Sequence, residues 1–254
     1  MNIQLVRHAT LWVEYAGLRL LVDPMFSDAK ANPPIVNSAN LHRNPLVALP
    51  SDRQQWLEPD AVLVTHLHQD HWDKAASSSL LKSVPIFCQP GDERNFMEDG
   101  FTSVTAVDQS LTFQCITISR TDGQHGTGLI GQKMGKVSGF VLQSDAEPTV
   151  YVAGDTIWCE EVKAALDAYH PDVTVVNAGG ARFLIGEPIT MDEEDVIHVC
   201  RYAPYTKVIA VHMDAINHCL VTRSDLRQGL QQAGLSEQVL IPEDGEWVET
   251  ANPR

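Results

Sequence analysis

The sequence has few basic residues, no long apolar run and no paired arrangement of cysteines. Its 254 residues include 18 Lys and Arg against 33 Asp and Glu, a formal net charge of −15. A chain of this charge has no overall electrostatic attraction for nucleic acid or for an anionic membrane, so we expect neither as a partner. No apolar run is long enough to span a bilayer, which excludes a helical membrane protein.

The cysteines and the first residues of the chain bear on where the protein works. Five cysteines are an odd number, and their spacing shows no pairs, which is typical of reduced thiols and not of a disulfide framework. Residues 1–8 lack the basic start and apolar core of a secretory signal. We therefore expect a cytoplasmic protein. With 44% hydrophobic residues the chain can bury a sizeable core, and we expect one domain over residues 1–254.

The strongest chemical signal follows the apolar run at residues 61–64, a predicted buried strand. Three histidines and one aspartate lie within six positions there, as His66, His68, Asp70 and His71. Alternate residues of a strand share a face, so His66 and His68 can point to the same side. Imidazole together with carboxylate suits a divalent metal such as zinc. This segment therefore predicts a metal site at the end of a strand.

The string His66-x-His68-x-Asp70-His71 resembles the signature of the metallo-β-lactamase superfamily. Residues 20–24, Leu-Leu-Val-Asp-Pro, are similar to the first motif of that superfamily, in which an aspartate closes a strand. The likeness extends over most of the chain and is greatest to ascorbate-6-phosphate lactonase-like proteins. It is more distant to the phospholipase D that acts on N-acyl phosphatidylethanolamine. The resemblance implies an α/β fold, a four-layer αββα sandwich, with a binuclear metal centre.

By this resemblance the metal ligands fall into two sets. One metal would be held by His66, His68 and His125, the other by Asp70, His71 and His212, and Asp155 would bridge them. From the residues alone, His125 is a histidine in a glycine-flanked loop, and Asp155 is equally well explained as a helix cap after a strand. The cofactor implied is a pair of divalent ions, zinc in the first place, with manganese and iron as alternatives.

Further candidates to orient the ligands or to contact substrate are Asp23, His8, Arg182 and His218. Asp23 closes a predicted strand and is the main candidate to orient an imidazole, whereas His8 is equally a buried histidine satisfied by backbone groups. Arg182 follows two glycines and could bind a phosphate or carboxylate, or could be a surface arginine in an ordinary turn. His218 lies six residues beyond His212 and is expected to support a metal ligand or to contact substrate, and not to bind metal itself.

These residues and the resemblance predict a binuclear metal-dependent hydrolase. A metal-bridging hydroxide would attack a small-molecule lactone, ester or phosphodiester, neutral or anionic, and Asp70 would ligate and relay the proton. One alternative is a nuclease-type phosphodiesterase, which the acidic composition disfavours. Another is a non-catalytic metal-binding protein of the same fold. The sequence is also compatible with a homo-oligomer.

Periodicity and chain breakers predict alternating strands and helices along most of the chain. Prolines recur between residues 24 and 59, and this irregular segment is expected to cover the metal site, to contact another subunit or to be a plain surface loop. We further expect a strand over residues 111–119 and no helix directly after the loop at 121–128. A capping box at 190–193 and a last buried strand at 207–211 complete the pattern.

Overall fold

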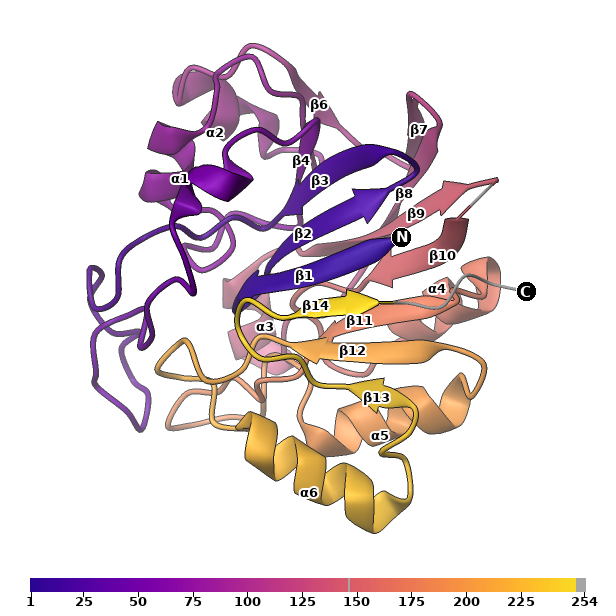
Figure 1. The fold of residues 1–254 in the computed structure, drawn as a ribbon. Coiled ribbons are helices and arrows are strands. Elements are labelled where there is room, and N and C mark those ends of the chain that lie inside the picture. Colours follow the sequence, from indigo (N-terminus) through magenta and orange to yellow (C-terminus); the bar gives the residue numbers. More distant parts are fainter. Residues whose placement is uncertain (146, 250–254) are drawn as a thin grey trace.

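The computed structural model describes residues 1–145 and 147–249 and contains two seven-stranded sheets (Figure 1). The first sheet has, in spatial order, β14 (Trp247–Glu249), β1 (Asn2–Arg7), β2 (Thr10–Tyr15), β3 (Leu18–Val22), β4 (Ala61–Val64), β5 (Ile86–Cys88) and β6 (Val104–Ala106). The second has β13 (Val239–Leu240), β12 (Lys207–Val211), β11 (Val173–Asn177), β10 (Glu147–Val152), β9 (Ser138–Ser144), β8 (Ile116–Asp122) and β7 (Ser110–Phe113).

Helices cover the outer faces of the two sheets. The helices are α1 (Lys74–Ser79), α2 (Glu93–Glu98), α3 (Gly128–Met134), α4 (Glu160–Tyr169), α5 (Glu193–Tyr202) and α6 (Arg223–Ala233), with a 3-10 helix at Arg53–Trp56; of these, α3 buries no side chain against a sheet. The inner faces of the sheets share one apolar core, α1 and α2 pack against the first sheet, and α4, α5 and α6 pack against the second. The predicted αββα sandwich is therefore confirmed. Within the described ranges, every helix is too short or too polar to traverse a lipid bilayer.

The direction of the strands brings several of their ends to the same edge. Strands β3 to β6 are parallel, as are β10 to β13. Strand β1 reaches β3 through two antiparallel steps, and β8 reaches β10 in the same way, so each runs in the direction of its parallel neighbours. Polar residues that follow these strands therefore gather at one edge, where open α/β sheets commonly bind ligands.

Two predictions around residues 111–128 are wrong. Residues 111–119 do not form one strand, because β7 and β8 make a hairpin in which Phe113 pairs with Ile116. Its turn has no glycine to signal it, and Gln114 itself adopts the positive φ of 53°. Helix α3 does follow the glycine-flanked loop, with Thr127 at its N-cap position and no buried side chain of its own. A helix without an apolar core-facing stripe leaves little periodicity to detect.

The chain also departs from prediction near its later helices and strands. Asp192, not Thr190, caps α5, since its carboxylate accepts hydrogen bonds from the backbone of Glu194 and Asp195. The Thr190 hydroxyl accepts a hydrogen bond from the Ala181 N–H instead. Two short strands follow β12, and the second, β14, pairs with β1 at the start of the chain. Strands of two and three residues carry too little pattern to be predicted.

The proline-rich segment between β3 and β4 is held down by two buried side chains. Arg7, fully buried, donates hydrogen bonds to the carbonyls of Met25, Ser27 and Val47. Asn217, which follows β12, accepts hydrogen bonds from the Ile35 N–H at 2.9 Å and from the Asn44 side chain at 2.7 Å. It also donates to the Ser38 hydroxyl at 2.6 Å. An irregular backbone is thereby fixed in one position.

Candidate metal centre

Histidine and aspartate side chains from distant parts of the chain meet in two groups. The first contains His66, His68, His125 and Asp155, and the second contains His8, Asp70, His71 and His212. In each group one potential ligand atom per residue lies within 4.8 Å of the others. The structure thus brings together every residue predicted as a ligand and adds His8 to them.

Strand ends place these residues. His8 follows β1, the segment from His66 to His71 follows β4, His125 follows β8, Asp155 follows β10 and His212 follows β12. His8 and His212 both have positive φ angles, 61° and 69°, which turn the chain sharply as it leaves the sheet. Non-glycine residues in this region are strained and cluster at functional sites.

The donor atoms of the first group have the spacing of ligands to one metal ion. His68 Nδ1 lies 3.0 Å from His66 Nε2 and 3.3 Å from His125 Nε2. Asp155 Oδ2 lies 3.5 Å from His125 Nε2 and 3.8 Å from His66 Nε2. Four ligands at zinc-like bond lengths around a tetrahedral ion are separated from one another by about 3.3–3.6 Å. The spacing of these donor atoms therefore fits a small divalent cation.

The second group has similar spacing. His71 Nε2 and His212 Nε2 are 3.3 Å apart, and Asp70 Oδ2 lies 3.8 Å from the first and 3.4 Å from the second. Asp155 reaches this group too, with Oδ1 at 3.2 Å from His212 Nε2 and Oδ2 at 3.3 Å from His71 Nε2. A carboxylate within reach of both groups is what a bridging ligand requires.

Hydrogen bonds at the far side of the imidazoles fix which nitrogen faces the centre. His71 Nδ1 donates to Asp23 Oδ2 at 2.8 Å, and His125 Nδ1 donates to the Ile189 carbonyl at 2.6 Å. The Thr65 hydroxyl, 3.1 Å from His66 Nδ1, donates to Asp23 Oδ2 at 2.7 Å. A ring that uses Nδ1–H in this way presents the lone pair of Nε2 to a metal. Asp23 therefore contacts the imidazole of a predicted ligand, as expected from the sequence.

Two orienting residues were missed from the sequence. Asn177, the last residue of β11, donates from Nδ2 to Asp155 Oδ1 at 2.7 Å. Cys219 places its sulfur 3.5 Å from His212 Nδ1. The end of a predicted parallel strand would have been a sufficient signal for Asn177, because β11 ends beside the strands that carry Asp155 and His212. No comparable pattern pointed to Cys219.

Burial and charge set the protonation of the two groups. Burial lowers the pKa of His66 and of His125, so these rings are neutral and can ligate. Burial opposes ionisation of Asp155, but His212 and His71 outweigh it and hold the pKa of this carboxyl well below its usual range. Burial likewise opposes protonation of His71, yet the carboxylates of Asp155, Asp23 and Asp70 raise its pKa well above the ordinary value. The site is thus built to stabilise positive charge among these side chains.

His8 is not the buried, backbone-satisfied histidine that the alternative interpretation predicts. It is fully buried, and backbone groups do not satisfy it: among the described residues its Nδ1 has no hydrogen-bond partner. Its Nε2 lies 3.1 Å from Asp70 Oδ2, and its ring lies against that of His212, with centroids 3.6 Å apart and planes inclined by 36°. Burial lowers the pKa of His8 to about 3, so the ring is neutral. It contacts both Asp70 and His212 and supports the second group.

A cavity of about 140 Å³ opens onto both groups. Its lining consists of Ile35, His68, Gln69, Asp70, His125, Met134, Asp155, Phe183, Ile189 and His218. Ile35 belongs to the proline-rich segment, which therefore covers the metal site. His218 is buried at the cavity, and its Nδ1 has no hydrogen-bond partner within the described ranges.

Arg182 does not line this cavity. Its backbone N–H donates to the His218 carbonyl at 3.0 Å, and the residue is half-buried. None of the described residues that line the cavity is a lysine or an arginine. Of the two alternatives for Arg182, binding a phosphate or carboxylate at this cavity is therefore disfavoured, and an arginine in an ordinary turn is favoured.

Similar proteins are known for the whole length of the chain. Residues 18–213 match the model of the β-lactamase superfamily domain. The UPF0173 protein YddR of Bacillus subtilis is 38% identical over 251 residues, 97% of this chain and 98% of the relative. An isothiocyanate hydrolase from Delia radicum gut bacteria has a crystal structure with 36% identity and a TM-score of 0.94, covering 98% of this chain and 99% of that one.

The structure of a possible metal-dependent hydrolase from Veillonella parvula has 34% identity and a TM-score of 0.95, with 98% of each chain covered. Matches over nearly the full length at 34–38% identity establish the family of this chain as well as its fold. The chain therefore belongs to the β-lactamase superfamily domain family and, within it, to the UPF0173 metal-dependent hydrolases.

Proposed function

We propose that this metal-dependent hydrolase adds water to an electrophilic carbon of a small, uncharged substrate, with an isothiocyanate as the first candidate. The observation that carries the proposal is the cavity itself, where two metal groups that share Asp155 open into a space without a lysine or arginine among its described lining residues. The full-length similarity to an isothiocyanate hydrolase supports the same substrate class.

The candidate metal ligands fall into two sets that share Asp155. His66, His68 and His125 would hold one cation and Asp70, His71 and His212 the other, with Asp155 between them. Two bound divalent ions, zinc in the first place and manganese or iron as alternatives, lower the pKa of water and polarise the bond under attack. Nothing in this chemistry requires a serine or cysteine nucleophile.

Asp70 and His218 are the candidates for proton transfer and substrate contact. Asp70 lines the cavity with Oδ2 beside His8 Nε2, and it can accept the proton that the attacking water loses. Burial lowers the pKa of His218 to about 4, so its ring is neutral near pH 7. Its unpartnered Nδ1 is free to hydrogen-bond a heteroatom of the substrate.

For an isothiocyanate the atoms balance with water alone. The water oxygen bonds to the central carbon, the carbon–nitrogen π pair moves to nitrogen, and nitrogen takes a proton to give a thiocarbamate. The carbon–nitrogen bond then breaks, the amine takes the second proton, and carbonyl sulfide departs. Each proton that the water loses is thus returned to the nitrogen of the leaving amine.

Lactones and carboxylic esters are the second candidate, because their carbonyl carbon can be attacked by the same residues. Phosphodiesters and phosphorylated sugar lactones are the third candidate: two bound dications could receive one anionic oxygen, but the described lining offers no lysine or arginine to hold a further charged group. A nuclease and a non-catalytic metal-binding protein remain the outcomes against which the proposal is tested.

The test measures initial rates with protein loaded separately with zinc and with manganese. The panel contains an alkyl isothiocyanate, a plain lactone, a phosphorylated sugar lactone, a carboxylic ester and a phosphodiester, and Asp155→Ala is the control. We expect turnover of the isothiocyanate that is lost in the control. Turnover of the phosphodiester alone, or no turnover with two metals bound per chain, would contradict the proposal.

A further inference from the structure

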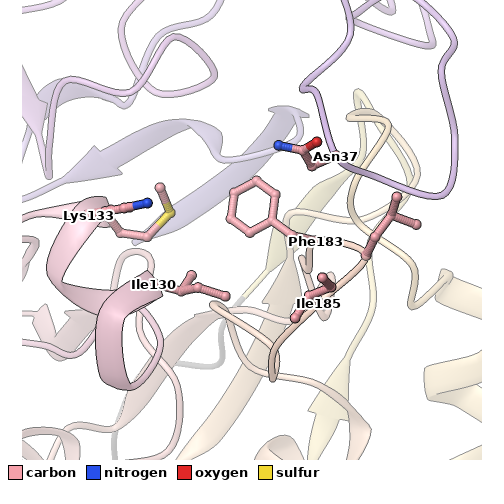
Figure 2. Close-up of a pocket in the computed structure, with 7 residues that line it drawn as sticks. Asn37, Ile130, Lys133, Phe183 and Ile185 are labelled. Atoms are coloured by element: carbon pink, nitrogen blue, oxygen red, sulfur yellow. The ribbon is translucent and has the colours of Figure 1, made fainter.

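A second and larger pocket, drawn in Figure 2, shares two lining residues with the metal cavity. Its volume is about 440 Å³, and its lining consists of Asn37, Ile130, Lys133, Met134, Phe183, Leu184 and Ile185. In Figure 2 the ring of Phe183 lies between Ile130 and Lys133 of α3 on one side and Ile185 on the other. The lining is mostly apolar, and the volume lies in the range of small-molecule sites.

The two spaces share part of their walls. Met134 and Phe183 line the apolar pocket and also the cavity at the metal groups. The Phe183 ring also lies against His218 of that cavity, with ring centroids 6.1 Å apart. Met134 and Phe183 therefore form a common wall between the metal cavity and the apolar pocket.

The segments that line the pocket are connected, along the chain and by packing, to the segment that carries the metal-group residue His125. His125 directly precedes the turn into α3, and its Nδ1–H is fixed by the Ile189 carbonyl. A Cβ on Gly126 would lie 2.7 Å from the Ile189 side chain, and one on Gly186 would lie 2.3 Å from Ile130 Cδ1. Such close approaches pack α3 against the segment around residues 183–189. The segment that carries His125 and the segments that line the pocket are therefore packed against each other.

Exposed apolar side chains gather at the mouth of the pocket. Leu184 is 68% exposed and Ile185 is 83% exposed, although large aliphatic side chains gain stability from burial. The Leu184 N–H is nevertheless bonded to the Asn37 carbonyl, so the backbone that presents these side chains is fixed. Apolar surface held open at the entrance of a site is typical of ligand binding.

We propose that this pocket binds the apolar substituent of the substrate, an inference that rests on the proposed function. The substrate would then be an electrophile that carries an uncharged alkyl or aryl group of roughly four to eight carbon atoms, a size that a pocket of this class can enclose. Phe183 and Met134 line the passage between the reactive end and this group, and Ile130, Leu184 and Ile185 would cover it.

The experiment uses the full-length, zinc-loaded protein and a series of isothiocyanates with methyl, ethyl, butyl, hexyl and 2-phenylethyl groups. Burial of each methylene contributes about 0.8 kcal/mol, which is about a four-fold change in binding. We expect KM to fall about two- to four-fold per methylene up to the length that fills the pocket, with a smaller change in kcat. A KM that is independent of chain length would overturn the inference while leaving the proposed function intact.

Two variants and a control locate the effect. Ile185→Asp at the mouth and Phe183→Ala at the junction should each reduce the gain per methylene to less than about 1.5-fold, because the apolar contact is weakened. Leu81→Asp, at a side chain 63% exposed outside the pocket lining, should keep the full gain. Equal chain-length dependence in all of these proteins would refute the assignment of the pocket.

A binding measurement separates this inference from the proposed function. The neutral fluorophore N-phenyl-1-naphthylamine should bind the wild-type protein and be displaced by hexyl isothiocyanate, and both signals should weaken in Ile185→Asp. Displacement without turnover would refute the proposed function and retain the pocket as an apolar ligand site. If light scattering shows instead that Ile185→Asp converts a dimer to a monomer with unchanged probe binding, the face covers a second copy and the inference is wrong.

Discussion

Asn217 is a single side chain that holds the proline-rich segment over the metal cavity, and its removal has a calculable cost. Its Oδ1 accepts hydrogen bonds from Ile35 and Asn44, and its Nδ2 lies within hydrogen-bond distance of the Ser38 hydroxyl and the carbonyls of Ile35 and Asn40. Asn217 is 1% exposed. Asn217→Ala leaves the Ile35 N–H and the Asn44 amide without this acceptor, whereas the Ser38 hydroxyl keeps its hydrogen bonds to the carbonyls of Ile35 and Asn40.

The expected loss of stability follows from the burial of those partners. A buried donor or acceptor left unpaired costs about 1–3 kcal/mol, and water can compensate the groups of Ile35 and Asn40 that are only partly buried. We therefore expect the free energy of unfolding to fall by about 2–4 kcal/mol. In a protein of this size each kcal/mol lowers Tm by about 2–4 °C, so the total shift is about 5–15 °C.

The assay is thermal unfolding of the metal-loaded protein, followed by limited proteolysis within residues 24–59. Asn95→Ala is the control, since Asn95 is exposed on α2 and alanine suits a helix. The variant should also lose kcat/KM, because Ile35 lines the cavity, while two metals remain bound. A Tm shift below about 2 °C, or cleavage no faster than in the control, would refute the idea that Asn217 fixes this segment.

Three further predictions concern the metal centre. Asp155→Ala should lose bound metal and activity together, because this carboxylate reaches both groups; metal analysis that still finds two ions per chain would contradict a bridging role. Asp23→Asn should keep the fold but weaken metal affinity about 10–100-fold, since His71 loses its carboxylate partner, and a competition titration against a chelator measures this. His218→Ala should keep two metals, and loss of one would make His218 a ligand. Because burial lowers the pKa of folded His218 to about 4 from 6.5, the unfolded state takes up the proton first, so stability that is full above pH 6.5 falls as pH drops toward 4. His218→Ala should therefore lose less stability than wild type between pH 7 and pH 5, and equal losses in denaturant titrations would show that His218 is not the group responsible.

Local pattern was sufficient for most of the fold and for the first ligand segment. Strand β4 is apolar and buried along its whole length, and β3, β10 and β12 are buried over their last three or four residues; a polar residue follows each strand within three positions. The spacing of His66, His68, Asp70 and His71 is itself local, so a single strand end and turn can present them together. Where the signal was weak, as in the glycine-free turn after Phe113, prediction failed.

The sequence by itself determined the alternation of strands and helices and the chemistry of the ligands, because periodicity and residue type act within a few positions. The four-layer arrangement was expected only from the resemblance to the metallo-β-lactamase superfamily. Tertiary structure alone decided that the His8 ring lies against His212, that β14 pairs with β1 and that Asn217 holds Ile35. It also decided that Phe183 joins an apolar pocket to the metal cavity. These contacts join residues far apart in the chain, and they depend on strand direction and on close approaches of the backbone that no local pattern records.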